Sequence, residues 1–150
     1  MKYFFLIMLT LLTFTAAMAI TPDDILGDYM LRDDMSGEDA KVRIYSNGQG
    51  GYDAQIIWLA QPNNSDGTER KDEKNPDLKL RSRKAYEIIV AHDLMFNQEK
   101  NRWETDRLYH PSFGRYFKAY MVFESKVILK VRGYIGTPAI GQTQKWKKIK

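Results

Sequence analysis

The chain has no cysteine among its 150 residues. This absence excludes disulfide bonds, thiol catalysis, zinc–cysteine sites and the attachment of haem or lipid to a cysteine. A domain without such links must be stabilised by the packing of its core and by the hydrogen bonds of its secondary structure. A chain of this length can bury enough surface to do so.

Histidine is almost as scarce, since the chain has only His92 and His110. His92 precedes Asp93, but adjacent residues on a strand point to opposite faces, so the two do not form a site. No serine lies in a Gly-x-Ser-x-Gly elbow. The acidic residues fall mostly in turns, where they bond to nearby backbone. We therefore expect no catalytic residue, no metal site, no cofactor and no enzyme; a hydrolase that uses a carboxylate pair is the least favoured alternative.

Long apolar runs are absent except at the N-terminus. Lys2 is followed by an apolar stretch from Tyr3 to Thr15 and then by Ala17-Met18-Ala19. The stretch is shorter than a membrane-spanning helix, which needs about 20 residues, and its order is that of a secretory signal peptide. We predict a signal peptide over residues 1–19, cleaved after Ala19, and one domain over residues 20–150. The mature protein is then periplasmic or secreted, with no stable membrane anchor.

The excess of positive charge is also small, because the formal net charge is only +4. The lysines around Trp146 form a short basic tail, which we interpret as a solvated end of the fold. Nucleic-acid binding requires a denser basic face with interleaved aromatic residues. We expect no nucleic-acid partner, and we expect a monomer.

The mature sequence is rich in segments that alternate apolar and polar residues, and this period of two indicates β-strands. A glycine-rich turn over residues 46–51 joins two of them in a hairpin. A short helical turn is possible at Pro22 to Leu26. The eight expected strands cover residues 27–32, 41–45, 52–59, 85–90 with a possible extension to 96, 102–109, 115–123, 126–132 and 142–148.

Eight strands in an antiparallel meander expose two edges unless the sheet closes. We predict an all-β fold, an eight-stranded up-and-down barrel, with an open two-sheet sandwich as the alternative. One polar, turn-rich segment from about residue 60 to residue 83 interrupts the strands. Irregular segments of this length are uncommon in compact domains and are functional or mobile.

Four segments together resemble the exported bacterial family known as domain of unknown function 2147. They are Ile56–Leu59 with Asn64–Gly67, Asn75–Asp77 with Leu80–Arg83, Leu108–Pro111, and Lys130–Gly136 with Gly141–Trp146. The resemblance covers residues 25–149, and it implies a lipocalin-like barrel in the bacterial envelope. It implies no reaction and no catalytic residue. The chain departs from the family in having His110 at an expected acidic position and in lacking a cysteine pair that some members carry near residues 47–53.

The aromatic residues favour a ligand-binding barrel. Trp58, Trp103, Tyr109 and Trp146 fall on positions predicted to point inward, where they would line a pocket or simply fill it. Arg107 shares this parity, and an inward arginine needs a buried partner or an anionic ligand. Our first hypothesis is a barrel that binds a small, partly apolar or anionic amphiphile, with Arg107 or Arg81 as the charged anchor.

The segment Asn75-Pro76-Asp77 to Arg83 supports a second hypothesis. Arg81 and Arg83 are spaced so that both can face one side and bind a carboxylate or phosphate. A filled barrel would then use this loop to dock on an envelope protein or on peptidoglycan. The structural alternative is that Asp77 pairs with an arginine and fixes the loop across one end of the barrel.

Overall fold

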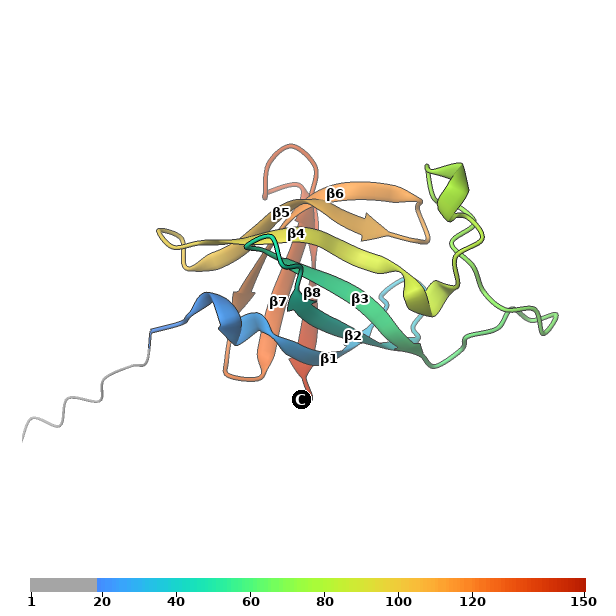
Figure 1. The fold of residues 1–150 in the computed structure, drawn as a ribbon, viewed down its shortest axis with the longest axis horizontal. Coiled ribbons are helices and arrows are strands. Elements are labelled where there is room, and N and C mark those ends of the chain that lie inside the picture. The colour runs from blue at the N-terminus through green and yellow to red at the C-terminus, as the bar shows by residue number, and fades with distance from the viewer. Residues whose placement is uncertain (1–18) are drawn as a thin grey trace, which may run out of the picture.

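The computed structural model describes residues 19–150 and contains a closed barrel of eight antiparallel strands (Figure 1). The predicted barrel is confirmed, and the open sandwich is wrong. The predicted signal peptide lies outside the described residues except for Ala19. The strands are β1 (Gly27–Arg32), β2 (Asp39–Ser46), β3 (Tyr52–Leu59), β4 (Ile89–Asn97), β5 (Arg102–His110), β6 (Arg115–Phe123), β7 (Ile128–Tyr134) and β8 (Gly141–Lys148).

Each strand pairs with its neighbours in the sequence, and β8 returns to β1 to close the barrel. This seam is short: Tyr29 pairs with Lys148 and Met30 with Lys147. Asp28 extends it, because its N–H donates to Lys150 O at 3.0 Å. Gly27 makes this approach possible. Its φ of +140° suits glycine alone, and a Cβ there would lie 2.3 Å from Lys150 O.

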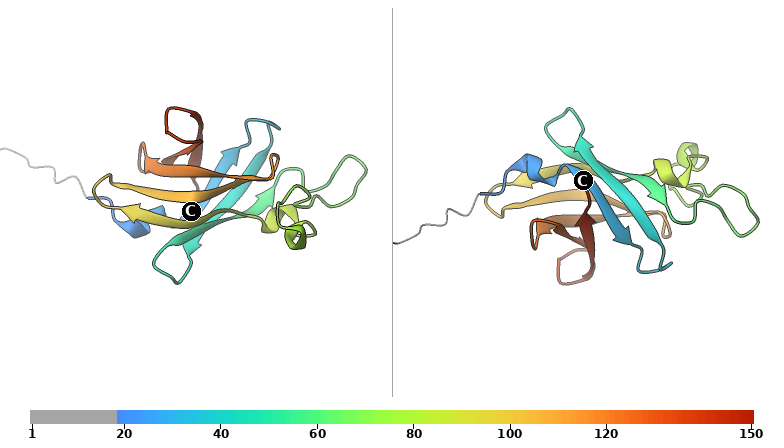
Figure 2. Two further views of the ribbon diagram at one scale, coloured as in Figure 1. Left: turned by 90° about the horizontal axis from the view of Figure 1, so that it is seen from above. Right: turned by 90° about the horizontal axis from the view of Figure 1, so that it is seen from below.

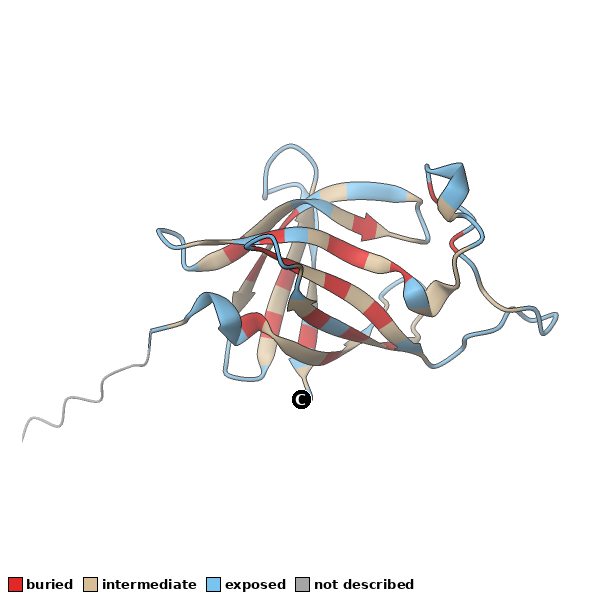
Figure 3. Ribbon diagram, viewed as in Figure 1, coloured by how far each residue is buried: buried red, intermediate tan, exposed pale blue. Residues whose placement is uncertain are grey.

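Alternation along the strands explains the core. Val42 and Ile44 on β2 are buried and face inward, as their alternate positions in the strand predict. Ala54 and Ile56 on β3 are buried and face inward in the same way. Residues between them are more exposed, which gives the banded pattern of burial along the ribbons in Figure 3. One face of each strand therefore fills or lines the barrel, and the other meets solvent.

The register shifts between β2 and β3, twice between β3 and β4, and between β5 and β6; two of these β-bulges change which residues face the interior. On β3, Trp58 pairs with Lys41 while Ile56 pairs with Val42, so Ile57 is an extra residue. On β5, Thr105 pairs with Ala119 and Leu108 pairs with Phe117. Two residues lie between Thr105 and Leu108, but only one lies between their partners, so β5 contains one extra residue here. A bulge moves every residue beyond it to the opposite face.

A short 3₁₀ turn, η1 (Pro22–Ile25), closes one end of the barrel. Ile25 is fully buried, and the Trp103 indole N–H donates to Pro22 O at 3.0 Å. The hydroxyls of Tyr29 and Tyr52 donate to Ile25 O and to the Asp23 carboxylate, at 2.7 and 2.6 Å. The helical turn expected at Pro22 to Leu26 is thus present, and it lies at one end of the barrel (Figure 1). We call η1 the plug.

The long irregular segment extends from residue 60 to residue 88 and projects beyond the opposite end of the barrel (Figure 2). It contains two 3₁₀ turns, η2 (Leu78–Leu80) and η3 (Ala85–Glu87). The strand expected to begin at Ala85 begins at Ile89 instead, since residues 85–87 form η3. Ile88, at the end of the segment, is buried in the core.

Candidate functional site

The barrel contains a cavity of about 600 Å³ in the half that lies away from η1. The loops 33–38, 111–114 and 135–140 surround its mouth together with the long segment. Its volume lies in the range of small-molecule sites in proteins. The apolar part of its wall comes from all eight strands and from the end of the long segment: Leu31, Ala40, Val42, Ile56, Leu59, Ile88, Val90, Leu108, Phe117, Val131 and Trp146.

Polar groups in the inner wall are few. Gln142 and Gln144 alternate with outward residues on β8, so they share the inner face with Trp146. The Trp146 indole N–H donates to Gln144 Oε1 at 3.3 Å. The amide groups therefore give a largely apolar cavity a small number of hydrogen-bonding positions on one side.

Large apolar side chains surround the mouth. Met35, Phe113, Ile135 and Ile140 come from three different loops and border the cavity. Between 49% and 68% of each residue is exposed, although the barrel has interior space for apolar groups. Exposed apolar residues that gather around one opening indicate a binding surface.

Charged residues also border the mouth, and most of them are acidic. Asp33 begins the loop after β1, and its Oδ1 accepts hydrogen bonds from the backbone N–H groups of Met35 and Ser36, both at 2.8 Å. Partial burial raises the pKa of this carboxyl, but the two N–H groups, His110 and the Ser36 hydroxyl together outweigh burial, so the pKa is lowered. Asp33 is therefore an anion at the mouth at any pH near neutrality.

His110 faces the cavity close enough to Asp33 for their charges to interact. Burial lowers the pKa of His110, and the nearby Asp33 only partly opposes this shift. Its Nδ1 is buried and has no hydrogen-bond partner among residues 19–150. Its ring packs on Phe113 with 4.6 Å between the ring centroids. The imidazole is thus neutral at pH 7 and forms part of an aromatic wall.

A buried cluster attaches the long segment to β5 beside the mouth. The Asp72 side chain is fully buried; its Oδ1 accepts from the Tyr109 hydroxyl at 2.6 Å. Its Oδ2 accepts from Arg83 Nη2 at 2.7 Å and from Asn75 Nδ2 at 2.8 Å. The Arg83 guanidinium balances the charge of the buried carboxylate, and the two neutral donors satisfy its remaining lone pairs, which lowers the cost of burying it. We call Asp72, Asn75, Arg83 and Tyr109 the latch.

A family model described as an uncharacterized protein conserved in bacteria, DUF2147, matches residues 27–148. The chain belongs to this family. The expected resemblance is confirmed over the whole barrel. Segments that carry the resemblance form much of the cavity wall, because β7 and β8 supply Val131, Gly133, Gln142, Gln144 and Trp146.

A solved structure supports the same fold. Protein HP1028 from Helicobacter pylori, described as belonging to the lipocalin family, is similar with a TM-score of 0.68 and 21% sequence identity. The match covers 83% of this chain and 82% of that one. The predicted lipocalin-like barrel is confirmed by this likeness, which concerns the fold alone. No curated protein matches the chain.

Two features are absent from residues 19–150. Within this part of the chain, no helix has the length and apolar character needed to cross a bilayer. The same residues contain no group of three or more histidine or acidic side chains arranged to hold a metal ion.

The predicted site residues are divided among different places. Trp146 borders the cavity, as expected. Trp103 faces inward but belongs to the closed end, where it packs against Phe96 and Phe123 at centroid distances of 5.0 and 5.7 Å. It is fully buried and does not border the cavity.

Trp58 and Arg107 are not inside the barrel, and the expectation that they point inward is wrong. Trp58 is 42% exposed, with Lys41 Nζ 5.1 Å from its ring centroid. Arg107 is on the outside, half exposed, and pairs with Asp93 at 3.0 Å. The two bulges are the cause, because each changes the face of the residues that follow it.

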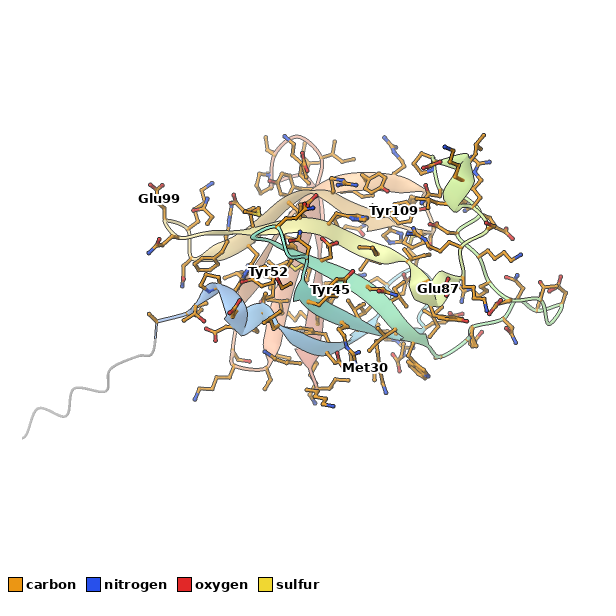
Figure 4. All side chains as sticks on the ribbon, in the orientation of Figure 1. Met30, Tyr45, Tyr52, Glu87, Glu99 and Tyr109 are labelled. Carbon is orange, nitrogen blue, oxygen red and sulfur yellow. The ribbon has the colours of Figure 1, made fainter. Side chains whose placement is uncertain are left out.

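Tyr109 borders the cavity but directs its side chain elsewhere. It pairs across the sheet with Tyr116, which is 38% exposed, and the two rings lie 5.0 Å apart. Directly opposed residues share a face, so Tyr109 lies on the outer side of β5, where the long segment buries it. Figure 4 shows it at the end of the barrel near that segment, and Tyr52 at the end near the plug.

The loop residues have structural roles. Asn75 is fully buried in the latch, and Arg81 Nε donates to its carbonyl oxygen at 2.8 Å. Asp77 accepts from the N–H of Lys79 and so begins η2 after Pro76. Arg83 pairs with Asp72, not with Asp77. The loop is fixed as the structural alternative requires, but by a different acid, and Arg81 does not reach the cavity.

Proposed function

We propose that the protein is an exported binding protein of the bacterial envelope that holds one small, partly apolar molecule in the barrel cavity. The observation that carries this proposal is the cavity itself, about 600 Å³ with apolar walls and an opening bordered by apolar side chains. At about 30 Å³ per water-sized group, such a volume accommodates roughly 20 non-hydrogen atoms. Export rests on the predicted signal peptide.

The site favours binding over catalysis. The inner wall offers glutamine amides and one neutral imidazole, which can orient a ligand but do not form a nucleophile with its base. The half of the barrel next to η1 is packed with large side chains, so the cavity has a solid floor. A ligand therefore enters and leaves through the same mouth. The cavity supports this proposal over the alternative of a filled barrel.

A cavity-filling variant tests the proposal. Val131 lies on β7 and borders the cavity, so the additional volume of Val131→Phe occupies ligand space. Val127→Phe is the matched control, because Val127 is 48% exposed between β6 and β7 at the other end. The protein is purified from the native envelope fraction and examined by native mass spectrometry, followed by tryptophan fluorescence titration with the molecule found.

We expect a small-molecule adduct on the wild type and on Val127→Phe, and its loss, by at least about tenfold in affinity, on Val131→Phe. The melting temperature of each variant shows whether Val131→Phe is folded. Trp146→Phe removes the fluorescence response if the ligand lies in the cavity, whereas Trp58→Phe leaves it. Equal binding by a folded Val131→Phe and the wild type contradicts the proposal.

A further inference from the structure

The mouth of the cavity is acidic, although the whole chain is positively charged. Four carboxylates border the cavity, from Asp33, Asp34, Glu38 and Asp39, against two guanidiniums, from Arg70 and Arg115. Four negative and two positive groups leave a formal charge of −2 at the mouth, whereas the chain carries +4. The negative charge of the residues that border the cavity therefore arises from their local arrangement and not from the overall composition of the chain.

Pairing within the protein removes some of these charges. Arg70 Nη1 lies 2.6 Å from Glu38 Oε2 and also donates to Gln61 O, so this pair is neutral as a unit. Asp39 pairs with Arg32 at 3.2 Å, on the exposed surface. Among the residues that border the cavity, this leaves Asp33 and Asp34 against Arg115. Two further cations lie on the loops around the mouth: Lys74 Nζ donates to Ser112 O at 2.8 Å, and Arg132 Nη2 donates to Pro138 O at 2.8 Å.

Asp33 is the best placed of the free charges. Both backbone hydrogen bonds to its carboxylate are accepted by Oδ1, which leaves Oδ2 without a backbone donor. The imidazole across the mouth does not cancel its charge, because burial keeps His110 neutral. A cationic group at the mouth would thus meet an ionised carboxylate without a competing positive charge from His110.

Aromatic rings border the same cavity as this carboxylate. Phe113 packs on His110 and, at 6.3 Å, on Phe117 in an edge-to-face arrangement, and all three rings border the cavity. About half of Phe113 is exposed. The faces of aromatic rings attract ammonium groups, and clusters of aromatic rings recognise quaternary ammonium ions in proteins.

We propose that the preferred ligand is a cationic amphiphile, whose apolar body fills the cavity and whose ammonium group lies at the mouth between Asp33, Asp34 and the ring of Phe113. This inference rests on the proposed function and defines its ligand class. It differs from the sequence-based expectation of an anionic ligand, because Arg107 and Arg81, the expected anchors, do not border the cavity.

The test compares three amphiphiles with the same dodecyl chain: dodecyltrimethylammonium, dodecyldimethylamine oxide and dodecanoate. Each is titrated into the mature protein below its micelle concentration, with Trp146 fluorescence and calorimetry as readouts. We expect the ammonium compound to bind about tenfold more tightly than dodecanoate, which is what two partly exposed charge pairs provide. The amine oxide lies between them, and added salt reduces the difference.

The variant Asp33→Asn/Asp34→Asn removes both free carboxylates while asparagine still accepts the backbone hydrogen bonds of the turn. We expect it to lose the preference for the ammonium compound and to keep its affinity for the amine oxide. Asp66→Asn/Asp77→Asn is the matched control. It makes the same charge change at two other turn-forming residues that do not border the cavity, and it leaves the preference intact.

The outcomes separate the two proposals. Equal or tighter binding of dodecanoate overturns the cationic ligand class while leaving a ligand-binding barrel. A preference that survives in Asp33→Asn/Asp34→Asn overturns the assignment of the head-group site. If none of the three compounds binds the folded protein, the proposed function itself fails.

Discussion

The two ends of the barrel use the same residue type in different ways. Trp103, at the closed end, gives its indole N–H to the backbone of Pro22 and is enclosed by Phe96 and Phe123. Trp146, nearer the mouth, gives its N–H to Gln144 on its own strand and borders empty space. Trp103 holds the plug in place through this hydrogen bond, whereas the N–H of Trp146 finds its acceptor within its own strand. One end is thus built for stability and the other for access.

The largest effect should come from removing Trp103. Trp103→Ala leaves a cavity in the packed end and removes a bond to η1, so we expect a loss of about 4 kcal/mol in the free energy of unfolding. Phe117→Ala, at the existing cavity, creates no new enclosed space and should cost about 1 to 2 kcal/mol. Urea unfolding measures both. Equal losses would show that the two ends are packed alike.

A smaller effect should follow from opening the latch beside the mouth. Asp72→Ala leaves Arg83 without its buried partner, and we expect a loss of about 3 kcal/mol. Tyr109→Phe removes only one donor and should cost about 1 kcal/mol. Hydrogen exchange should rise in residues 60–88 and remain unchanged at the plug. Faster exchange throughout the barrel in Asp72→Ala would mean that the latch and the plug are one unit.

The latch also shows where sequence patterns reach their limit. The strands were predictable because Val42 and Ile44, or Leu129 and Val131, alternate with charged residues that face solvent. Nothing local marks Asp72 as buried: it lies in a run of lysine and acidic residues, and its three donors are at positions 75, 83 and 109. A buried acid that depends on distant donors has no periodic signature.

Bulges limit the prediction of the site in the same way. Parity placed Trp58 and Arg107 inside, and it would have been correct in strands without an extra residue. A bulge needs only one extra residue and has no distinctive sequence pattern, but it changes which side chains face the cavity. Leu108 and His110 consequently border the cavity on β5, where Arg107 was expected. The barrel was therefore predictable, whereas the lining of its mouth was not.

The smallest effect concerns pH and again distinguishes the plug from the mouth. Burial, together with the hydrogen bond to Asp23, raises the pKa of Tyr52 to about 12, from the usual value of about 10. Because the folded state holds this proton more tightly than the unfolded state, its contribution to stability is complete below about pH 10. It is lost as the pH rises toward 12.

Tyr52→Phe should therefore be less stable than the wild type at neutral pH, by about 1 kcal/mol, and the difference should shrink above pH 10. Unfolding curves measured from pH 8 to pH 11 check this, with tyrosinate absorbance as a second readout. Tyr116→Phe is the control, since Tyr116 is more than a third exposed near the mouth. If the difference in free energy of unfolding between the wild type and Tyr52→Phe stays constant from pH 8 to pH 11, the hydrogen bond of Tyr52 is not the source of the pH dependence.

The seam between β1 and β8 has a consequence for how the barrel forms. Every other strand pair joins neighbours in the sequence, so those contacts can form early and locally. The seam joins Tyr29 to Lys148, and it needs the backbone of Lys150 to come within reach of Gly27. Barrel closure is therefore the step with the largest loop-closure cost, and it cannot begin on the ribosome until the last strand has been made. Until then the chain is an open sheet with two free edges, the state in which it is most exposed to pairing with another copy.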